Sequence, residues 1–513
     1  MTALHISTQV GVIGAGAMGA GIAQVAAKAG HIVKLYDNRE GAAKTAIELT
    51  SKQLYRLVER KKISTQDAEK TLANLHVAQT LEDFSSAGLV IEAIVENIDV
   101  KQSVFASLEA ICSPECVLAS NTSSLSITRL AAGMAHPERF VGVHFFNPAP
   151  IMKLVEIVSG LVTSKAVANS LYETVLAWGK KPVYAASTPG FIVNRVARPF
   201  YAESLRLKQE GVADCATLDA LMRHSGGFRM GAFELTDLIG HDVNYAVTCS
   251  VFDAYYGDFR FQPSLVQKEL VDAGLLGRKT GQGFYSYHDD ADKPSASIRP
   301  PSSTPSYPLC SASGELAQLQ PLCERLLSHL DDQFIVTEDE GQSSVSAICI
   351  GEARLMLTDG RMATERANAE GIEHLILIDL ALDYKATTHI ALSRSYGTPD
   401  SVFQQVVDVF ALSGIAVSEV KDSPGLVVMR TVAMLANEAA DAALNGVASI
   451  EDIDIAMTYG VNYPCGPLAW ADTLGVANVL TVLGHLQRTY GEDRYRPSLL
   501  MTQRSLEQRG FYD

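Results

Sequence analysis

The sequence lacks the features that mark membrane and secreted proteins. None of its apolar stretches approaches the roughly 18 residues that a bilayer-spanning helix needs. Residues 1–14, MTALHISTQVGVIG, have neither the basic start nor the apolar run of a signal peptide. We therefore expect a cytoplasmic protein without a membrane partner.

Paired cysteines and excess positive charge are missing as well. The eight cysteines have neither the density of a disulfide framework nor the repeated C-x-x-C spacing of a zinc site. The 42 basic residues stand against 58 acidic ones, for a net charge of −16, whereas a nucleic-acid partner normally requires a basic face. These absences predict reduced, mostly buried thiols, no metal site and no nucleic-acid partner.

Apolar residues are abundant, and the first of them form a recognisable pattern. With 47% apolar content over 513 residues, the chain is expected to fold as two to four domains. Residues 9–38, QVGVIGAGAMGAGIAQVAAKAGHIVKLYDN, predict a strand, a glycine-rich turn, a helix up to Gly30 and a second strand ending at Asp37. The turn holds the residues expected to contact a dinucleotide: Gly14, Gly16, Ala17, Met18 and Gly19.

Each glycine of this turn has an expected task. Gly14 permits the tight turn, Gly16 lets the backbone approach a pyrophosphate, and Gly19 lets the helix pack closely on the strand. The helix start supplies N–H donors and a positive dipole for the phosphates. Asp37 is expected to bind the adenosine ribose and to repel a 2′-phosphate, which predicts NAD as the cofactor. Arg39 keeps NADP open as an alternative.

Three further apolar segments, residues 88–97, 116–124 and 140–148, predict strands of the same sheet. Polar side chains lie at or just past the ends of these segments, namely Glu96, Ser123 and His144. Because the carboxyl ends of parallel strands meet at one edge of a sheet, we expect these side chains to gather beside the dinucleotide.

His144 opens the segment HFFNPAPIMKLVE, and Glu156 closes it. A lone histidine is more often structural than catalytic, but this one ends a strand beside a predicted cofactor site. A glutamate within hydrogen-bond reach would hold the imidazole in one tautomer and raise its basicity. The pair therefore predicts a general base that takes a proton from an alcohol as hydride leaves for NAD.

Five motifs occur in a fixed order along residues 8 to about 290: GVIGAGAMGAGIAQVAAKAG, EAIVEN, ASNTSSLSIT, HFFNPAPIMKLVEIV and STPGFIVNR, followed by GRKTGQGFYSY. In these motifs the chain resembles the L-3-hydroxyacyl-CoA dehydrogenase family. The resemblance implies an NAD-dependent enzyme that oxidises an L-3-hydroxyacyl-CoA to the 3-ketoacyl-CoA.

The resemblance also implies roles for single residues. His144 matches the catalytic base and Glu156 its carboxylate partner, while Ser123 and Asn194 match groups that hydrogen-bond the substrate. Cofactor-contacting positions are matched by Asp37, Glu96, Lys101 and Asn147. The stretch before LEDF at 81–84 resembles a helical arm that helps to bind coenzyme A, and its basic run at 60–62 is either a phosphate contact or a solvated helix face.

The second half of the chain repeats part of the first at an offset of 235 residues. TPGFIVNR at 188–195 corresponds to SPGLVVMR at 423–430, and further identical residues stay in phase beyond it. Met429 takes the place of Asn194, so we expect the second copy to be structural. Residues 315–420 contain strand-like segments but no glycine fingerprint before a helix, which predicts a reduced α/β remnant without NAD.

The predicted fold is an N-terminal α/β Rossmann-like doubly wound domain, an all-α domain, a degenerate α/β segment and a second, duplicated all-α domain. The predicted limits are 1–186, 187–290, a Pro- and Ser-rich linker at 291–314, 315–420 and 421–513. This tandem layout resembles the 3-hydroxyadipyl-CoA dehydrogenases of phenylacetate breakdown and some bacterial 3-hydroxybutyryl-CoA dehydrogenases. We expect the two helical domains to form an intrachain pseudo-dimer, and further assembly into a homo-oligomer is left open.

Two other functions stay open at this point. One is a dehydrogenase of a free 3-hydroxy acid, such as a sugar acid, and the other is a non-catalytic NAD-binding structural or sensory protein. The acyl-chain length is also open. Arg198, four residues after Asn194, is a candidate to bind a terminal carboxylate, or else an ordinary surface residue.

Overall fold

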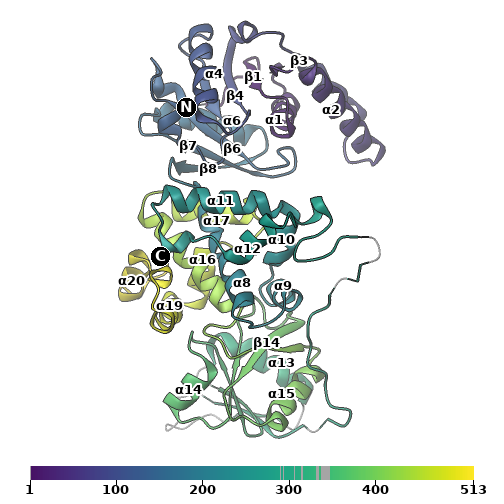
Figure 1. Cartoon of the computed structure of the whole chain (residues 1–513), viewed down its shortest axis with the longest axis vertical. Helices are drawn as coiled ribbons and strands as arrows, with labels where there is room; N and C mark the ends of the chain where they lie inside the picture. Colours follow the sequence, from purple (N-terminus) through teal and green to yellow (C-terminus); the bar gives the residue numbers. More distant parts are fainter. Residues whose placement is uncertain are drawn as a thin grey trace. The chain divides into compact units, whose positions relative to one another are not determined.

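The structure of the chain, a computed structural model, describes residues 2–288, 291–292, 294–305, 307–313, 316–330, 334–336 and 347–513. The chain divides into two compact units, both drawn in Figure 1. Unit 1 comprises Met1–Arg195 and Asn445–Val461, and unit 2 comprises Val196–Leu444 and Asn462–Asp513. Among the described residues, no helix combines the length and apolar character needed to span a membrane.

Unit 1 is built on an eight-stranded sheet in the order β3-β2-β1-β4-β5-β6-β7-β8. Its strands are β1 (Gln9–Ile13), β2 (Val33–Tyr36), β3 (Leu75–Val77), β4 (Ala87–Glu92), β5 (Val117–Ser120), β6 (Phe140–Phe145), β7 (Leu154–Ser159) and β8 (Lys181–Ala186). All neighbours are parallel except β6 and β7. The strand order reverses at β1, and ligands of doubly wound sheets bind at such a reversal. The predicted Rossmann-like N-terminal domain is confirmed.

The central strands β4, β5 and β6 are almost wholly buried, which suits strands covered by helices on both faces. The helices of this part are α1 (Ala17–Lys28), α2 (Ala42–Glu59), α3 (Thr65–Ala73), α4 (Ile98–Ile111), α5 (Ile127–Leu130) and α6 (Lys165–Ala177). Helices α2 and α3 pack on each other beside β3, at the edge of the sheet, and form the helical arm expected from the sequence (Figure 1).

One helix from the C-terminal part of the chain belongs to unit 1. Helix α17 (Ile450–Gly460) packs on β7 and β8. The backbone N–H of Ala186 at the end of β8 donates to the carbonyl of Val447 at 2.7 Å, and the N–H of Tyr184 donates to Asp452 at 3.2 Å. This return of the chain was not foreseen, because the sequence prediction kept residues 421–513 together as one domain.

Unit 2 contains a second sheet, with seven strands in the order β10-β9-β11-β12-β13-β14-β15. The strands are β9 (Cys310–Ser313), β10 (Phe334–Val336), β11 (Ala347–Ile350), β12 (Ala353–Leu357), β13 (Leu375–Ile378), β14 (His389–Arg394) and β15 (Ala416–Glu419). This sheet is the α/β segment predicted in the second half. Strand β9 lies within the stretch predicted as linker, because Cys310 and Ala312 are buried in the core of this sheet.

Helices make up the rest of unit 2. They are α8 (Arg198–Gln209), α9 (Cys215–His224), α10 (Ala232–Ile239), α11 (His241–Ala254), α12 (Leu265–Asp272), α13 (Gln320–Leu330), α14 (Ala363–Glu370), α15 (Asp400–Leu412), α16 (Val428–Leu444), α18 (Pro467–Leu474), α19 (Val476–Tyr490) and α20 (Leu499–Leu506). Helix α16 is buried over most of its length and packs on α8, α18, α19 and α20. Its buried charges have partners, as Arg430 does in Glu203 of α8 at 2.7 Å.

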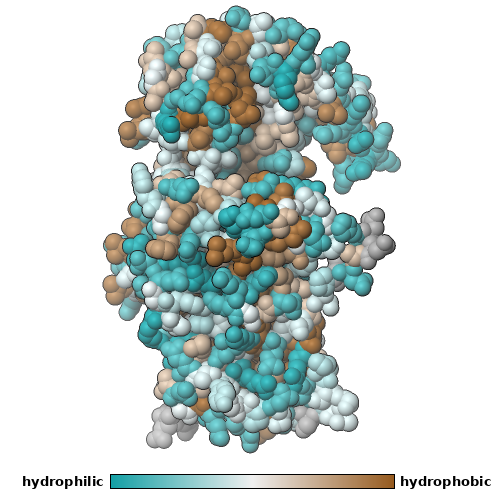
Figure 2. Space-filling model, viewed as in Figure 1, coloured by the Kyte–Doolittle hydropathy of each residue, from teal (hydrophilic) through white to brown (hydrophobic). Residues whose placement is uncertain are grey.

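The face of unit 2 shown in Figure 2 is mainly polar, with several apolar areas on it. Apolar residues gather there over α10, α11 and α12, where Leu238, Ile239, Val243 and Leu265 are exposed. Exposed apolar side chains of this kind are compatible with a homo-oligomer, an assembly that the sequence left open.

Candidate active site

His144 and Glu156 face each other across the one antiparallel pair of the first sheet. His144 lies in β6 and Glu156 in β7, and the register of the two strands sets them directly opposite. The Nδ1 atom of His144 is 2.6 Å from Oε2 of Glu156, and the glutamate side chain is fully buried. Directly opposite residues of an antiparallel pair have neighbouring Cβ atoms, so the strand register itself brings the two groups together.

Both carboxylate oxygens of Glu156 have partners. Its second oxygen, Oε1, accepts hydrogen bonds from the backbone N–H groups of Ile192 and Val193, each at 3.0 Å. These groups stand at the start of α7 (Val193–Val196), where N–H groups have no partner within the helix. Oε1 of Glu156 is therefore used as an acceptor by the backbone, and Oε2 is left to face His144.

The contact with Glu156 determines the tautomer of His144. Because the carboxylate can only accept, Nδ1 of the imidazole must carry the proton and donate it to Glu156. The other ring nitrogen, Nε2, then keeps its lone pair and can take a proton from a substrate. The imidazole packs against the rings of Phe146 and Phe191, with centroids 4.4 Å and 5.8 Å away. These aromatic contacts hold the ring plane, and sequence reasoning missed them.

Ser123 and Asn194 both lie close in the chain to residues that contact this pair. The side chain of Asn121, which follows β5, accepts from the N–H of Phe145 at 2.8 Å and so ties the loop of Ser123 to β6. Asn194 follows Ile192 and Val193, the two residues that donate to Glu156, and is half-buried in α7. The loop of Ser123 is thus tied to β6, and the residues just before Asn194 are tied to Glu156 of β7; the contact of either side chain with substrate stays a prediction.

The glycine-rich turn has the geometry expected of a dinucleotide site. Gly14 has a φ of +100°, and a Cβ there would lie 2.3 Å from the carbonyl oxygen of Ala93. A Cβ on Gly19 would lie 1.7 Å from the carbonyl oxygen of Gly14, so any larger residue would push α1 off the turn. By contrast, a Cβ on Gly16 would meet nothing within 4 Å.

The open side of this turn suits a phosphate group. Gly16 precedes α1 without any side-chain cap, and Ala17 and Met18 are the first residues of that helix. Their N–H groups therefore keep the donor capacity and positive dipole that bind phosphates at helix starts. The residues present fit a dinucleotide.

Asp37 stands directly after β2, at the position predicted to bind the ribose. Its carboxylate accepts from the backbone N–H of Ala15 at 2.8 Å, which links it to the glycine-rich turn. It also pairs with the guanidinium of Arg39 at 3.0 Å, and this hydrogen bond is the main reason why the pKa of Asp37 is lowered to about 2. Asp37 therefore stays charged throughout the physiological range, as repulsion of a 2′-phosphate requires.

Glu96 and Lys101 take part in a buried polar network. The ammonium of Lys101 lies 2.6 Å from Glu92 and 3.2 Å from Glu96. Glu96 also accepts from the hydroxyl of Thr122 and the N–H of Ser123. Burial, the largest single effect, raises the pKa of Glu96, but the charge of Lys101 and the hydrogen bonds from Thr122, Lys101 and Ser124 together outweigh it, so the pKa is lowered. Sequence reasoning missed Glu92, and a direct cofactor contact by Glu96 or Lys101 stays a prediction.

Asn147 is exposed just after β6, in the loop that leads to β7. The ammonium of Lys180 holds this loop, because it donates to the carbonyl oxygens of Ala149 and Met152. Burial lowers the pKa of Lys180 to about 8. The contact of Asn147 with the cofactor stays a prediction.

Unit 2 has a different residue where the repeat would place a histidine. Asp379 stands 235 residues after His144 and is fully buried next to β13. Its carboxylate accepts from the N–H groups of Val427, Val428 and Met429 at 3.0, 2.7 and 3.0 Å. One aspartate therefore caps a helix start, the task that Glu156 performs in unit 1. The sequence comparison of the two copies rested on Met429 in place of Asn194, although the same offset applied to His144 leads to Asp379.

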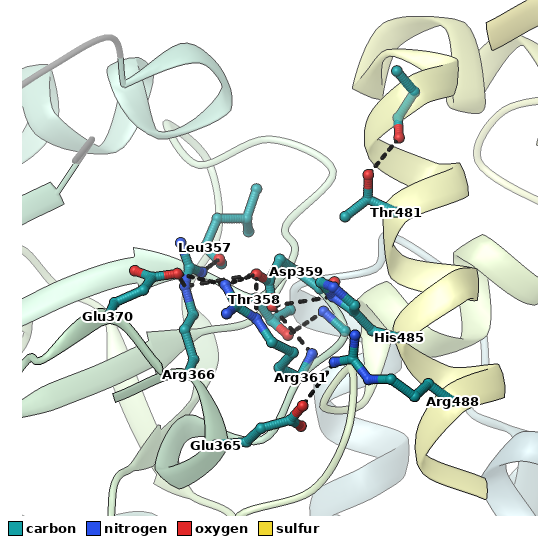
Figure 3. Close-up of polar contacts among 12 residues, drawn as sticks. Leu357, Thr358, Asp359, Arg361, Glu365, Arg366, Glu370, Thr481, His485 and Arg488 are labelled. Atoms are coloured by element: carbon teal, nitrogen blue, oxygen red, sulfur yellow. Dashed lines mark hydrogen bonds and ion pairs between the residues drawn. The ribbon is translucent and has the colours of Figure 1, made fainter. Parts of the chain in front are cut away.

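A cavity of about 260 Å³ lies in this part of unit 2, lined among others by Thr358, Met429 and Val482. Figure 3 shows the polar contacts beside it. His485 of α19 donates to the carbonyl oxygen of Asp359 at 2.7 Å, and Arg488 pairs with Glu365 of α14 at 2.7 Å (Figure 3). These contacts tie the sheet of unit 2 to its helices. The described residues contain no group of three or more His, Cys, Asp or Glu that could hold a metal ion.

Comparison with known domain families gives three matches. Residues 9–188 match the family described as 3-hydroxyacyl-CoA dehydrogenase, NAD binding domain. Residues 190–287 and 425–510 both match 3-hydroxyacyl-CoA dehydrogenase, C-terminal domain. Residues 355–424 match 3-hydroxybutyryl-CoA dehydrogenase reduced Rossmann-fold domain, which agrees with the reduced α/β remnant expected from the sequence.

Individual relatives agree with these matches. The chain is 43% identical over 502 residues to a 3-hydroxyadipyl-CoA dehydrogenase of Escherichia coli (strain K12), covering 98% of both chains. It is 40% identical over 281 residues to a probable 3-hydroxybutyryl-CoA dehydrogenase of Bacillus subtilis (strain 168), covering 55% of this chain and 98% of the relative. A crystal structure of 3-hydroxybutyryl-CoA dehydrogenase from Escherichia coli K12 substr. MG1655 has a TM-score of 0.88 at 42% identity, covering 98% of this chain and 99% of that one.

The match is therefore not confined to the dinucleotide-binding part, and it includes the sheet and helices of the second half. The chain belongs to the 3-hydroxyacyl-CoA dehydrogenase family and is an NAD-dependent oxidoreductase that acts on a CH–OH group.

Proposed function

We propose that His144 is the general base in the oxidation of an L-3-hydroxyacyl-CoA to the 3-ketoacyl-CoA. The observation that carries this proposal is the 2.6 Å contact between Nδ1 of His144 and Glu156, which leaves Nε2 free to accept the 3-hydroxyl proton. Glu156 stabilises the imidazolium that forms. NAD, when bound, supplies the acceptor for the hydride from C3.

Ser123 and Asn194 complete the site in this proposal. Their hydroxyl and amide groups hold the oxygen atoms of the substrate, so that the 3-hydroxyl points at Nε2 of His144. Gly14, Gly16, Ala17, Met18 and Gly19 bind the pyrophosphate of NAD, and Asp37 binds the ribose. We retain Glu96, Lys101 and Asn147 as cofactor-contacting positions, with Lys101 acting through Glu96.

The substrate in this proposal is 3-hydroxyadipyl-CoA or 3-hydroxybutyryl-CoA, because relatives of both names match the chain. A dehydrogenase of a free 3-hydroxy acid and a non-catalytic NAD-binding protein are the competing functions. Turnover of acetoacetyl-CoA with NADH, measured beside free acetoacetate, separates all three. Oxidation of NADH with the thioester alone is the expected result. Equal turnover of the free acid, or no turnover of either compound, would contradict the proposal.

We also infer that the helical domain is duplicated and that its two copies form a pseudo-dimer within one chain. The same family matches 190–287 and 425–510, and the non-glycine residues Phe191 and Leu426, 235 positions apart, both have a positive φ, of 48° and 53°. Helices α8 and α16, which correspond at this offset, pack on each other in unit 2.

Two backbone hydrogen bonds support the same inference. Ala186 donates to the carbonyl of Val447 within unit 1, and Lys421 donates to the carbonyl of Val212 within unit 2. Each donor and each acceptor corresponds to its counterpart at the offset of 235, so the two bonds are reciprocal. The helix contacts correspond as well, because α9 packs on β14 and its counterpart α17 packs on β7.

The limits 1–186, 187–290, 315–420 and 421–513 remain our proposed domain limits. The cytoplasmic location remains a prediction.

A further inference from the structure

Unit 2 contains a second and larger cavity, of about 550 Å³, which no step of the proposed reaction uses. It lies among α8, α11, α12 and two short 3₁₀ helices, η3 (Phe259–Phe261) and η7 (Asp493–Tyr495). Its volume is in the range of small-molecule sites. Most of its lining residues are apolar or neutral. The charged ones are four arginines and two glutamates: Arg198, Arg206, Arg260, Arg494, Glu210 and Glu492.

Arg198 is the exceptional member of this set. Its side chain is buried, with only 5% of the residue exposed. One guanidinium nitrogen donates to the hydroxyl of Thr248 at 3.0 Å, and the guanidinium packs on the ring of Tyr201 at 4.9 Å. Its Nε has no hydrogen-bond acceptor, and in the described part of the chain it forms no ion pair with a carboxylate.

The other three arginines of the cavity have carboxylate partners. Arg206 makes two hydrogen bonds to Glu492, at 3.1 and 2.9 Å. Arg260 lies 3.1 Å from Asp441, and Arg494 lies 3.6 Å from Glu492. Nε of Arg260 and Arg494 also lacks an acceptor, but in the described part of the chain Arg198 is the arginine of this lining that has no carboxylate within ion-pair distance.

A buried guanidinium without a counterion is rare, because taking a charge out of water costs free energy that only an opposite charge or hydrogen bonds offset. Burial accordingly lowers the pKa of Arg198. An anion in the cavity would supply both the opposite charge and the acceptor that Nε lacks. We propose that this cavity binds an aliphatic carboxylate, which pairs with Arg198.

The size of the charge and the lining favour a carboxylate over a phosphate. One uncompensated guanidinium matches the single charge of a carboxylate, whereas a phosphate monoester carries about −1.5 to −2 and would lie near the two glutamates. Leu205, Phe261 and Leu265 provide apolar contacts for methylene groups. The hydroxyl of Thr248 and the amide of Gln267 are polar groups in the same lining.

Such a carboxylate has two sources. It is either the far end of a dicarboxylic acyl chain, which rests on the proposed function, or a separate small acid that binds unit 2 as an effector. The following experiment separates the two.

The test uses the full-length chain and two thioesters with six-carbon acyl groups, 3-hydroxyadipyl-CoA and 3-hydroxyhexanoyl-CoA, which differ in the terminal carboxylate. We divide kcat/KM for 3-hydroxyadipyl-CoA by kcat/KM for 3-hydroxyhexanoyl-CoA. Arg198→Met should lower this ratio roughly tenfold or more, as expected for loss of a charged hydrogen bond in a buried site. Arg488→Met, which removes an exposed arginine of α19, serves as the control and should leave the ratio as it is. Arg198→Gln, which removes the charge but keeps an N–H donor, replaces Arg198→Met if that variant does not fold.

Calorimetric titration of the same proteins with hexanoate and with neutral hexanamide is the second measurement. A fall in the kcat/KM ratio identifies the substrate as the source. Hexanoate binding that is lost in Arg198→Met, with an unchanged ratio, identifies a separate acid. No change in either measurement would overturn the proposal. If the unmodified enzyme oxidised neither thioester, the proposed function would fail, while the titration would still decide whether the cavity binds a carboxylate.

Discussion

Glu156→Gln removes one charge and changes one atom at the centre of the proposed site. In the unmodified protein, one carboxylate oxygen accepts from His144 and the other accepts from the N–H groups of Ile192 and Val193. A glutamine has a single acceptor oxygen and an NH₂ group that only donates. It can satisfy either the histidine or the two backbone groups, but not both.

The two orientations of the amide differ greatly in free energy. With its oxygen on the backbone groups, the amide donates to Nδ1 of His144, and the ring proton moves to Nε2, which then cannot act as a base. The opposite orientation keeps the active tautomer but leaves two buried N–H groups facing a donor, at a cost of about 1–3 kcal/mol each. The active form is then disfavoured by about 2–6 kcal/mol, and kcat/KM should fall by at least roughly 30-fold.

The assay is steady-state oxidation of a 3-hydroxyacyl-CoA at neutral pH. NAD binding and the thermal midpoint should show that the variant is folded, and Glu138→Gln, at an exposed glutamate, is the control. Because Glu156 acts through His144, the losses of Glu156→Gln and His144→Gln should not add in the double variant. Nearly normal turnover of a folded Glu156→Gln enzyme would refute this account of the tautomer.

Five further outcomes are expected. His144→Gln should lower turnover by at least about 100-fold with NAD binding retained, and a smaller loss in steady-state kinetics would exclude it as the base. Asp37→Ala should narrow the preference for NAD over NADP, and an unmodified enzyme whose specificity constants favour NADP would contradict that role. Asp379→Ala should lower the free energy of unfolding by at least about 3 kcal/mol, since buried N–H groups lose their acceptor, while turnover stays normal; urea denaturation measures the loss. Burial raises the pKa of Asp379 from 3.8 to about 6, so the folded state favours the protonated form. The free energy of unfolding should therefore fall by about 3 kcal/mol as the pH rises from 3.8 through 6. This fall should be absent from Asp379→Asn, whose side chain does not titrate. A chain ending at residue 292 should dimerise or aggregate, because the face of α8 that packs on α16 becomes exposed; a fully active monomer in light scattering would contradict the pseudo-dimer.

Local patterns in the sequence were sufficient for the first domain. The strand–turn–helix unit around Gly14, Gly16 and Gly19 depends on steric limits that act between near neighbours, and the structure places these residues as expected. His144 and Glu156 were also predictable as a pair, because a short loop between two strands fixes which residues lie opposite. Their contact follows from the register of β6 and β7.

The partners of these groups were harder to predict from the sequence. Glu92 lies on the strand before Lys101, but nothing in the local pattern indicates that its carboxylate, and not solvent, meets the ammonium. The same holds for Arg198, whose spacing from Asn194 suggested a ligand contact or a surface position with equal weight. Its burial without a carboxylate partner became visible only once the helices of unit 2 were placed around it.

The sequence by itself predicted the Rossmann-like N-terminal domain, the NAD cofactor, the pairing of His144 with Glu156 and the internal repeat, because each depends on spacing along the chain or on residue types at fixed positions. Tertiary structure alone decided that α17 joins the first sheet, that β9 extends the second, and that Asp379 caps a helix start in place of a catalytic pair. These features arise from contacts between residues tens to hundreds of positions apart. Such contacts are selected by the burial of apolar surface and the pairing of backbone groups across the whole fold, and no local pattern records them.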